Sequence, residues 1–292
     1  MVEKSLTVSM VIPTLNAERE MPRLLESLLS QSYSLGEIIV IDSSSEDSTV
    51  EVSKAFEKTR VLVIRRKEFN HGLTRDLGIR EASGEIVCFV TQDAIPADSR
   101  YIENLIRPML EDETVAMVSG RQMAKDDARD FERLVRKYSY PEQSQTRCLA
   151  DIPRYGIRTF AASNACSAYR RSLVLELGGF GACNICEDIF MACKMIRAGY
   201  KVSYAAEARI LHSHNYGMRQ QFRRNREIAE FLDARKEFFF GASETDAGAL
   251  LMKNVLRDLL SRGQLAEALA FVANCAARFL GNRMGHKYPR KS

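Results

Sequence analysis

The stretch "LTVSMVIPTLNAEREMPRLLESLLSQSYSLGEIIVID", Leu6–Asp42, decides the fold class. It opens with a β-rich run that Pro13 stops, and leucines at helical spacing follow. It closes with the apolar run Glu37–Asp42, which is short and suits a strand buried on both faces. Strand, helix and strand therefore alternate with short connections. Such alternation predicts a parallel sheet with helices on both faces.

The rest of the chain extends this pattern and then departs from it. Up to about residue 120, further strands are expected at 60–64, 85–90 and 115–120, and helices within 43–56, 71–84 and 101–112. Beyond them we expect a helix at 128–140, an extended return to the sheet at 159–171, a helix at 187–200, a strand at 201–214, and helix after Met218. The sequence thus predicts an α/β domain over residues 1–226 and a C-terminal helical extension over residues 227–292.

The composition is that of an ordered globular chain. Of 292 residues, 46% are hydrophobic and 27% charged, and the net charge is +4, so a large core is expected and wholesale disorder is not. The seven cysteines are an odd number in mostly apolar surroundings, which favours reduced thiols and a cytoplasmic location. The first residues lack the apolar core of a signal peptide, and no run of ~20 apolar residues suggests a membrane span.

Several common catalytic motifs are absent. The first strand is followed by "PTLNAE" (Pro13–Glu18), not by G-x-G-x-x-G, and no G-x-x-x-x-G-K-[ST] occurs. A nicotinamide-dependent dehydrogenase or a P-loop nucleotidase is therefore disfavoured. G-x-S-x-G is also missing, which removes the nucleophile elbow of a serine hydrolase.

Polar residues follow several of the expected strands. In parallel sheets ligands bind beyond the carboxyl ends of the strands, so Asn16, Asp42, Arg65 and Asp93 should gather at one edge. The Asp42 carboxylate could accept the ring N–H of a pyrimidine, or it could cap the next helix. Asp93 could ligate Mg²⁺ or Mn²⁺ beside substrate phosphates, or it could be a turn residue.

Two further groups lie in the second half of the domain. Glu187 and Asp188 open a helix after a glycine-rich loop, where the helix dipole stabilises acids and where a general base could also stand. His212 and His214 are two residues apart on an expected strand, so they face the same way and could ligate a metal or contact phosphate; a structural role is the alternative.

Five segments together resemble family 2 glycosyltransferases of the GT-A fold. They are "VSMVIPTLNAE", "EIIVIDSSSEDST", "TRDLGIREASGEIVCFVTQDA", "SNACSAYRRSLVLELGGF" and "CEDIFMACKMIRAGYKVSYAAEARILH", in the expected order within roughly residues 7–226. "EFNHGLTRDLG" and "TQDA" narrow the resemblance to the bacterial branch that uses dTDP-L-rhamnose. In that branch the metal motif commonly keeps only its last carboxylate, so Thr91-Gln92-Asp93 resembles a one-carboxylate diphosphate site.

The resemblance implies a set of site residues and an inverting transfer of a hexose. Its donor-binding residues would be Pro13, Asn16, Glu18, Asp42, Asn70, His71, Arg75, Gln92 and Asp93. Asp188 would be the catalytic base with Glu187 supporting it, and Asp93 would bind Mg²⁺ or Mn²⁺ with His212 or His214. Gln221 and Arg224 resemble the acceptor motif of processive members, but the chain has no tryptophan, so processivity is not supported.

Two positions depart from the family pattern, and alternative hypotheses about the function remain. Asp76 stands where the family usually has Asn, and Ser43 follows Asp42 where many members have a second Asp. The expected partners are a nucleotide-sugar donor, with a dTDP-sugar favoured over a UDP- or GDP-sugar, and a glycan or lipid-linked saccharide acceptor. A non-catalytic protein with a decayed site is the alternative; a nucleotidyltransferase is disfavoured because "PTLNAE" lacks its glycine-rich basic loop.

The C-terminal region is basic and carries apolar stripes. No acid follows Glu267, whereas Arg278, Arg283, Lys287, Arg290 and Lys291 do. We expect helices that pack on the domain, rest on anionic lipid as a peripheral membrane surface, or do both. Nucleic acid is not expected as a partner, because no module or aromatic-basic interleaving supports it.

Overall fold

The computed structural model describes residues 6–242 and 247–287. The chain divides into two compact units. The first unit contains Met1–Gln122, Glu142–Ala150 and Phe160–His212, and the second contains Met123–Pro141, Asp151–Thr159 and Ser213–Ser292.

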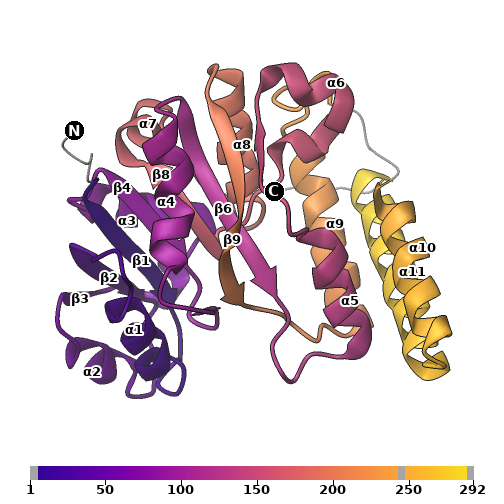
Figure 1. Cartoon of the computed structure of the whole chain (residues 1–292), viewed down its shortest axis with the longest axis horizontal. Coiled ribbons are helices and arrows are strands. Elements are labelled where there is room, and N and C mark those ends of the chain that lie inside the picture. Colours follow the sequence, from indigo (N-terminus) through magenta and orange to yellow (C-terminus); the bar gives the residue numbers. More distant parts are fainter. Residues whose placement is uncertain (1–5, 243–246, 288–292) are drawn as a thin grey trace. The chain divides into compact units, whose positions relative to one another are not determined.

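The first unit is built on one sheet with strand order β3-β2-β1-β4-β8-β6-β9-β5, and β7 pairs with β9 (Figure 1). The strands are β1 Val8–Thr14, β2 Glu37–Asp42, β3 Thr59–Val63, β4 Ile86–Val90, β5 Ile95–Pro96, β6 Val115–Met123, β7 Gln145–Arg147, β8 Cys166–Arg170 and β9 Lys201–Leu211. Its helices are α1 Met21–Leu29, α2 Thr49–Lys54, α3 His71–Glu81, α4 Tyr101–Glu111, α7 Arg171–Glu176 and α8 Glu187–Arg197.

The sheet is mixed. Strands β1 to β4 pair in parallel, and Thr14 lies opposite Asp42, so the carboxyl ends of β1 and β2 are level. Strand β8 then runs antiparallel to both β4 and β6. The expected α/β class with helices on both faces is confirmed. The sequence pattern anticipated the return of residues 159–171 to the sheet, but it did not anticipate the antiparallel direction or the two-residue strand β5.

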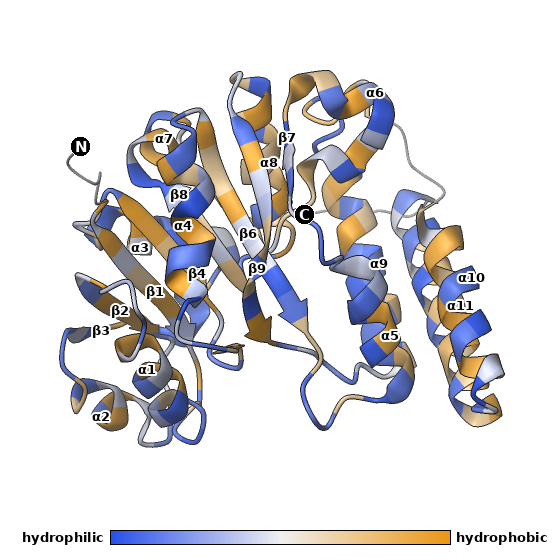
Figure 2. Cartoon of the chain, in the orientation of Figure 1, coloured by the Kyte–Doolittle hydropathy of each residue, from blue (hydrophilic) through white to orange (hydrophobic). Residues whose placement is uncertain are grey.

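Burial explains why the central strands form. Every residue of β4 is buried, as is nearly all of β1 and β2, and these strands are strongly hydrophobic (Figure 2). Helix α1 covers them with Met21, Leu24, Leu25 and Leu28, which share one face of the helix. Each such side chain contributes roughly 1.5–3 kcal/mol on burial, so this core fixes the strand ends that carry polar residues.

The second unit is helical. Its helices are α5 Asp130–Ser139, α6 Ile152–Tyr155, α9 Met218–Asp233, α10 Ala247–Ser261 and α11 Leu265–Lys287. Phe131 of α5 packs in one cluster with Val255, Leu259 and Phe271 of the last two helices. Gly281 lets α11 approach α9 closely, because a Cβ there would overlap the backbone oxygen of Phe222.

The compact units do not coincide with a division at residue 226. Helix α5 precedes that residue and helix α9 spans it, yet both belong with the C-terminal helices. The cause is hydrophobic packing, because the buried apolar face of α5 contacts α10 and α11. Residues 1–226 as one functional domain stay a prediction.

Candidate active site

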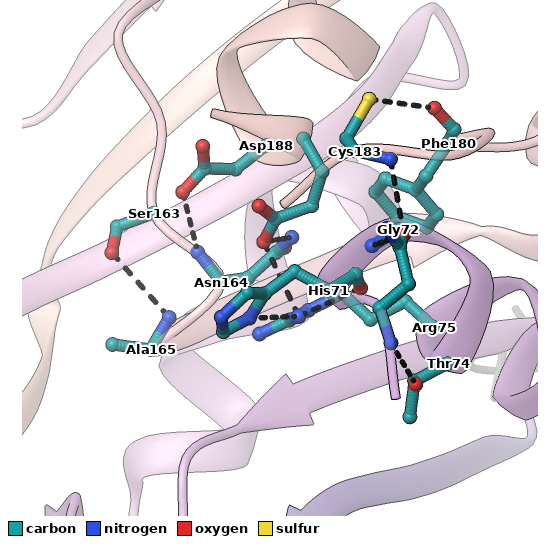
Figure 3. Close-up of polar contacts among 12 residues, drawn as sticks. His71, Gly72, Thr74, Arg75, Ser163, Asn164, Ala165, Phe180, Cys183 and Asp188 are labelled. Atoms are coloured by element: carbon teal, nitrogen blue, oxygen red, sulfur yellow. Dashed lines mark hydrogen bonds and ion pairs between the residues drawn. The ribbon is translucent and has the colours of Figure 1, made fainter. Parts of the chain in front are cut away.

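Two adjacent carboxylates begin helix α8, and Asn164 holds both of them. The Asn164 Nδ2 donates to Glu187 Oε1 at 3.1 Å, and the Asn164 backbone N–H donates to Asp188 Oδ2 at 3.2 Å (Figure 3). Asn164 is itself fixed, because its Oδ1 accepts hydrogen bonds from the hydroxyls of Ser167 and Tyr169. The pair is therefore held by a buried, satisfied network.

Arg75 compensates the charge of Glu187. Its Nη1 lies 3.3 Å from Glu187 Oε1, and both side chains are buried. The same nitrogen donates to the backbone oxygen of His71 at 2.9 Å, and the guanidinium lies 5.8 Å from the centre of the Phe89 ring. Breaking such a buried pair on one side costs several kcal/mol, so α3 and α8 are locked together here.

The surroundings push the two pKa values in opposite directions. Burial opposes the charge of Glu187, but Arg75 and the Asn164 amide outweigh it and hold the pKa of Glu187 below its ordinary value. Burial, and then the neighbouring charge of Glu187, raise the pKa of Asp188 to about 7. A carboxylate with a pKa near neutrality is matched to accept a proton as a general base.

Hydrogen bonds join helix α3 and its N-cap to the loop that leads to α8. Asn70 caps the helix by accepting from the N–H groups of Gly72 and Leu73, and it also accepts from Cys183 N–H at 3.0 Å. Asp76 accepts from the N–H groups of Phe180 and Gly181 at 2.7 and 2.9 Å. The acid at 76 thus satisfies two backbone donors, which accounts for this departure from the family pattern.

A second group of polar residues lies where β1 and β2 end. Asp42 is fully buried and accepts hydrogen bonds from the Thr14 hydroxyl at 3.2 Å, from Ser45 N–H at 2.8 Å and from the Ser45 hydroxyl. Asn16 has a φ of 49° and its Oδ1 accepts from Glu46 N–H. Asp42 therefore orders the loop at Ser45, but it does not cap the next helix, because α2 begins at Thr49 with Ser48 at its N-cap.

The neighbouring loops are tied to this group. Glu18 Oε2 accepts from Ser48 N–H at 3.0 Å. The Gln92 side chain makes two hydrogen bonds to the backbone of Leu15: it accepts from the N–H at 2.8 Å and donates to the carbonyl oxygen at 3.1 Å. The structure thus joins the ends of β1, β2 and β4 at one edge, as the strand pattern predicts.

Asp93 and His212 meet at the same edge of the first unit. His212 Nε2 lies 3.6 Å from Asp93 Oδ1, and both atoms belong to a group that could ligate a cation. The opposite ring nitrogen, Nδ1, lies 2.9 Å from Gln122 Oε1. Because metal-ligating histidines usually donate their other N–H to an oxygen, this arrangement fits a divalent cation at Nε2. At the place of the first motif carboxylate, the Thr91 hydroxyl is buried without a hydrogen-bond partner among the described residues.

The remaining sequence-derived residues take different places. Asn70, His71 and Arg75 lie with Glu187 and Asp188, not with Asp42. Pro13 lies in β1, and its side chain is half-buried. The other predicted residues belong to the second unit: His214, whose ring stacks on Tyr216, and the α9 residues Gln221, which is buried, and Arg224, which is exposed.

Sequence reasoning missed Asn164 and Gln122. Asn164 lies inside "SNACSAYRR", a segment that resembles the family. Nothing in the residue pattern indicates that it donates hydrogen bonds to both Glu187 and Asp188. Gln122 lies two residues beyond the strand expected at 115–120, and no spacing links it to His212, which lies 90 residues away.

The open mixed sheet, the acidic pair at α8 and the Asp–His pair at the strand ends fit a glycosyltransferase with a GT-A-like fold. Comparison with known proteins places it more closely. Residues 9–178, more than half of the chain, match the family described as "Glycosyl transferase family 2". The chain belongs to that family.

Two curated relatives are similar over much of their length. The O-antigen chain rhamnosyltransferase RfbN of Salmonella typhimurium is 42% identical over 219 residues, which cover 74% of this chain and 69% of the relative. The O-antigen chain rhamnosyltransferase WbaN of Salmonella anatum is 34% identical over 283 residues, covering 95% of this chain and 88% of the relative.

Solved structures agree on the fold. A mannosyltransferase from Pyrobaculum calidifontis, in complex with GDP-Man and Mn²⁺, matches with a TM-score of 0.67 and 17% identity over 98% of this chain and 89% of that one. GalNAc-T7 with UDP, GalNAc and Mn²⁺ matches with a TM-score of 0.57 and 16% identity over 81% and 51%.

Proposed function

We propose that the enzyme transfers L-rhamnose from dTDP-L-rhamnose to a hydroxyl of a glycan or lipid-linked saccharide in the synthesis of a surface polysaccharide. The similarity to two O-antigen chain rhamnosyltransferases supports the sugar and the kind of product. The observation that carries the chemistry is the acidic pair at α8, where Asn164 and Arg75 hold Glu187 charged beside Asp188.

The reaction we propose is one displacement with inversion. Asp188 accepts the proton of the acceptor hydroxyl while that oxygen bonds to the anomeric carbon. The bond from the anomeric carbon to the diphosphate oxygen breaks, and dTDP leaves with its electron pair. Because the attacking oxygen enters opposite the leaving group, the anomeric configuration inverts, as in inverting glycosidases. Asn164 would keep Asp188 in place, and the charges of Glu187 and Arg75 would set its basicity.

The donor would lie along the edge where β1, β2 and β4 end. Asp42 would accept the thymine ring N–H, and Asn16 and Glu18 would line the nucleoside pocket with Pro13. Gln92 would hold the strand-end loop against Leu15. His71 and Arg75 would face the sugar or diphosphate from α3, which Asn70 caps. Support comes from the joined loops of this edge.

Asp93 and His212, together with His214, would hold Mg²⁺ or Mn²⁺. A bound divalent cation would supply positive charge for the departing diphosphate. The donor set suits this role, because a carboxylate and an imidazole leave positions for phosphate oxygens. Gln221 and Arg224 of α9 would contribute to the acceptor site.

We further propose a peripheral position at the cytoplasmic face of a membrane, where a lipid-linked acceptor would be found. No helix among residues 6–242 and 247–287 is long and apolar enough to cross a bilayer. Helix α11 instead exposes Leu265, Leu269 and Phe279, and basic residues accompany them. Exposed apolar and basic side chains together favour anionic lipid surfaces.

A donor screen tests the proposal. The purified enzyme would be incubated with Mg²⁺ or Mn²⁺ and each of dTDP-rhamnose, UDP-glucose, UDP-GlcNAc and GDP-mannose, and the released nucleotide measured. We expect slow hydrolysis of dTDP-rhamnose above the others. Preference for a UDP- or GDP-sugar would replace the donor, whereas binding of dTDP without turnover, with or without added glycan, would support a decayed, non-catalytic site.

A further inference from the structure

We propose that Gln122 is a positioning residue that holds His212 in the tautomer able to bind a cation through Nε2. The inference rests on the proposed function, because it presumes a divalent ion at Asp93 and His212. Gln122 lies in β6 and is 2% exposed, and His212 follows β9 directly and is 8% exposed. Both belong to the first unit.

The contacts of Gln122 form a short chain of hydrogen bonds. Gln122 Oε1 accepts from His212 Nδ1 at 2.9 Å, and Gln122 Nε2 donates to the Ser163 hydroxyl at 2.7 Å. With its oxygen on the ring, the amide requires the imidazole proton at Nδ1. The lone pair then lies on Nε2, the nitrogen that is 3.6 Å from Asp93 Oδ1.

The other tautomer would work against metal binding. If the proton sat on Nε2, His212 would donate toward the Asp93 carboxylate and offer no lone pair to a cation. The attraction of Asp93 favours that arrangement when no ion is present. An acceptor fixed at Nδ1 is therefore what keeps the ring ready for a cation, and an amide oxygen in the interior provides it.

The same short segment also positions the catalytic base. Ser163 anchors Gln122, and the next residue, Asn164, donates to Asp188 and Glu187. Figure 3 shows Ser163 and Asn164 side by side, with Asp188 bonded to Asn164. One peptide thus links the support of the metal ligand to the support of the acid pair.

Two substitutions at the same position separate this role from a general structural one. Gln122→Met keeps the length of the side chain and removes the acceptor. Gln122→Glu keeps the acceptor, and a carboxylate can only accept from Nδ1–H, while Ser163 can turn its hydroxyl to donate. Gln31→Met is the matched control. Gln31 is also a buried glutamine of the first unit, and it makes hydrogen bonds to Ser27 O and Asp98 O and from Ile102 N–H.

The primary measurement is Mn²⁺ binding in the presence of saturating dTDP. The electron paramagnetic resonance signal of free Mn²⁺ reports how much of the ion is bound. We expect the dissociation constant to rise ~10- to 100-fold in Gln122→Met, the usual effect of removing a group that orients a metal ligand. Gln122→Glu should bind Mn²⁺ as tightly as wild type or tighter, and Gln31→Met should match wild type.

The second measurement needs no metal. The chain has four histidines, so the ¹⁵N spectrum of histidine-labelled protein can be assigned by His212→Gln. At about pH 8.5, well above the ordinary pKa of ~6.5, wild type and Gln122→Glu should carry the His212 proton at Nδ1, and Gln122→Met should shift it toward Nε2.

Each outcome decides something. Equal Mn²⁺ affinity in Gln122→Met and wild type, with an unchanged tautomer, overturns the role of Gln122 and leaves the metal proposal standing. No Mn²⁺ binding by wild type overturns the metal proposal and this inference with it, and the donor screen then reports on transfer separately. An equal loss of affinity in Gln31→Met would assign the effect to general destabilisation.

Discussion

Glu187 and Asp188 carry the same functional group on adjacent residues, yet their surroundings give them different chemistry. Arg75 and the Asn164 amide stabilise a charge on Glu187, while Asp188 lies half-buried beside that charge. Adjacent carboxylates with pKa values pushed apart are a strong sign of acid–base roles. At the scale of single residues, the surroundings therefore stabilise a charge on Glu187 and give Asp188 the pKa that suits the base role we propose for it.

The first prediction is the loss of catalysis in Asp188→Asn. The amide keeps the shape and removes the basicity, so we expect donor binding near that of wild type and a transfer rate lower by ~10²–10⁴. Glu187→Gln should be milder. Single-turnover transfer and calorimetry with dTDP measure the two effects.

A suitable control for that experiment is Asp112→Asn. Asp112 lies outside the candidate site and pairs with Lys201; both side chains are more than a third exposed, and such pairs contribute little. If Asp188→Asn transfers sugar at the wild-type rate while Glu187→Gln is inactive, the two roles are reversed. If both variants are active, the base lies elsewhere.

The pH profile gives a second prediction. If Asp188 works in its ionised form, kcat/KM should rise with pH through a midpoint near 7 and level off above it. In Glu187→Gln the rise should move to lower pH, because the charge that raises the pKa of Asp188 is gone and the positive charge of Arg75 remains. A midpoint that moves upward, or does not move, would contradict the assignment of Asp188.

Asp42 gives a third prediction at this scale. Asp42→Asn should weaken binding of dTDP and UDP by about 1–3 kcal/mol, the size of one base-edge contact, and weaken GDP binding less. Because Asp42 also holds the loop at Ser45, Ser45→Ala is the control for loop disorder. Equal losses for purine and pyrimidine nucleotides, matched by Ser45→Ala, would make Asp42 structural.

At the scale of elements, α3 depends on a close approach to the loop before α8. Gly72 is the second residue of α3, and a Cβ there would overlap the backbone oxygen of Gly181. Neither side of this contact can move by a change of rotamer. The helix that carries Arg75 is therefore positioned by the absence of a side chain.

A fourth prediction follows for Gly72→Ala. We expect a loss of about 1–3 kcal/mol in the free energy of unfolding, the usual cost of overpacking, together with slower transfer because Arg75 is displaced from Glu187. The matched control is Gly248→Ala, the second residue of α10, where a Cβ meets nothing within 4 Å. That change should stabilise by up to ~1 kcal/mol through helix propensity.

Urea unfolding and single-turnover transfer of both glycine variants decide the matter. A Gly72→Ala protein with wild-type stability and rate would show that the loop at Gly181 yields freely. The contact would then have no part in placing Arg75.

Elements show best what a single sequence can predict. Apart from the two-residue β5, the strands up to residue 120 and the helix at Glu187 follow from local patterns, namely apolar runs, helical spacing and glycine stops. The antiparallel β8 does not, since its direction depends on which strands it pairs with. Asn164 and Gln122 were missed for the same reason: the partners of Gln122 lie 41 and 90 residues away, and no local pattern encodes them.

At the scale of the whole molecule, basic residues and exposed apolar side chains are concentrated near the C-terminal end of the chain. No acid follows Glu267. Helix α11 exposes Leu265, Leu269, Val272, Phe279 and Leu280, with exposed fractions between 46% and 73%. These positions recur at helical spacing on one face of α11. Arg290 and Lys291 of the basic tail lie outside the described residues.

The last prediction is that this face of α11 carries membrane binding. In the double variant Leu269→Glu and Phe279→Glu, binding to vesicles of anionic phospholipid should fall steeply, because two exposed apolar side chains that would contact the lipid are lost and two negative charges face it. Hydrolysis of dTDP-rhamnose in solution should stay near the wild-type rate.

Val63→Glu, which replaces an exposed apolar residue of β3 in the first unit, should bind vesicles like wild type. Binding of the wild type should weaken with salt, since the Debye length is only ~10 Å at 0.1 M. Vesicle binding that survives the double variant, or that ignores lipid charge and salt alike, would remove α11 as the contact surface.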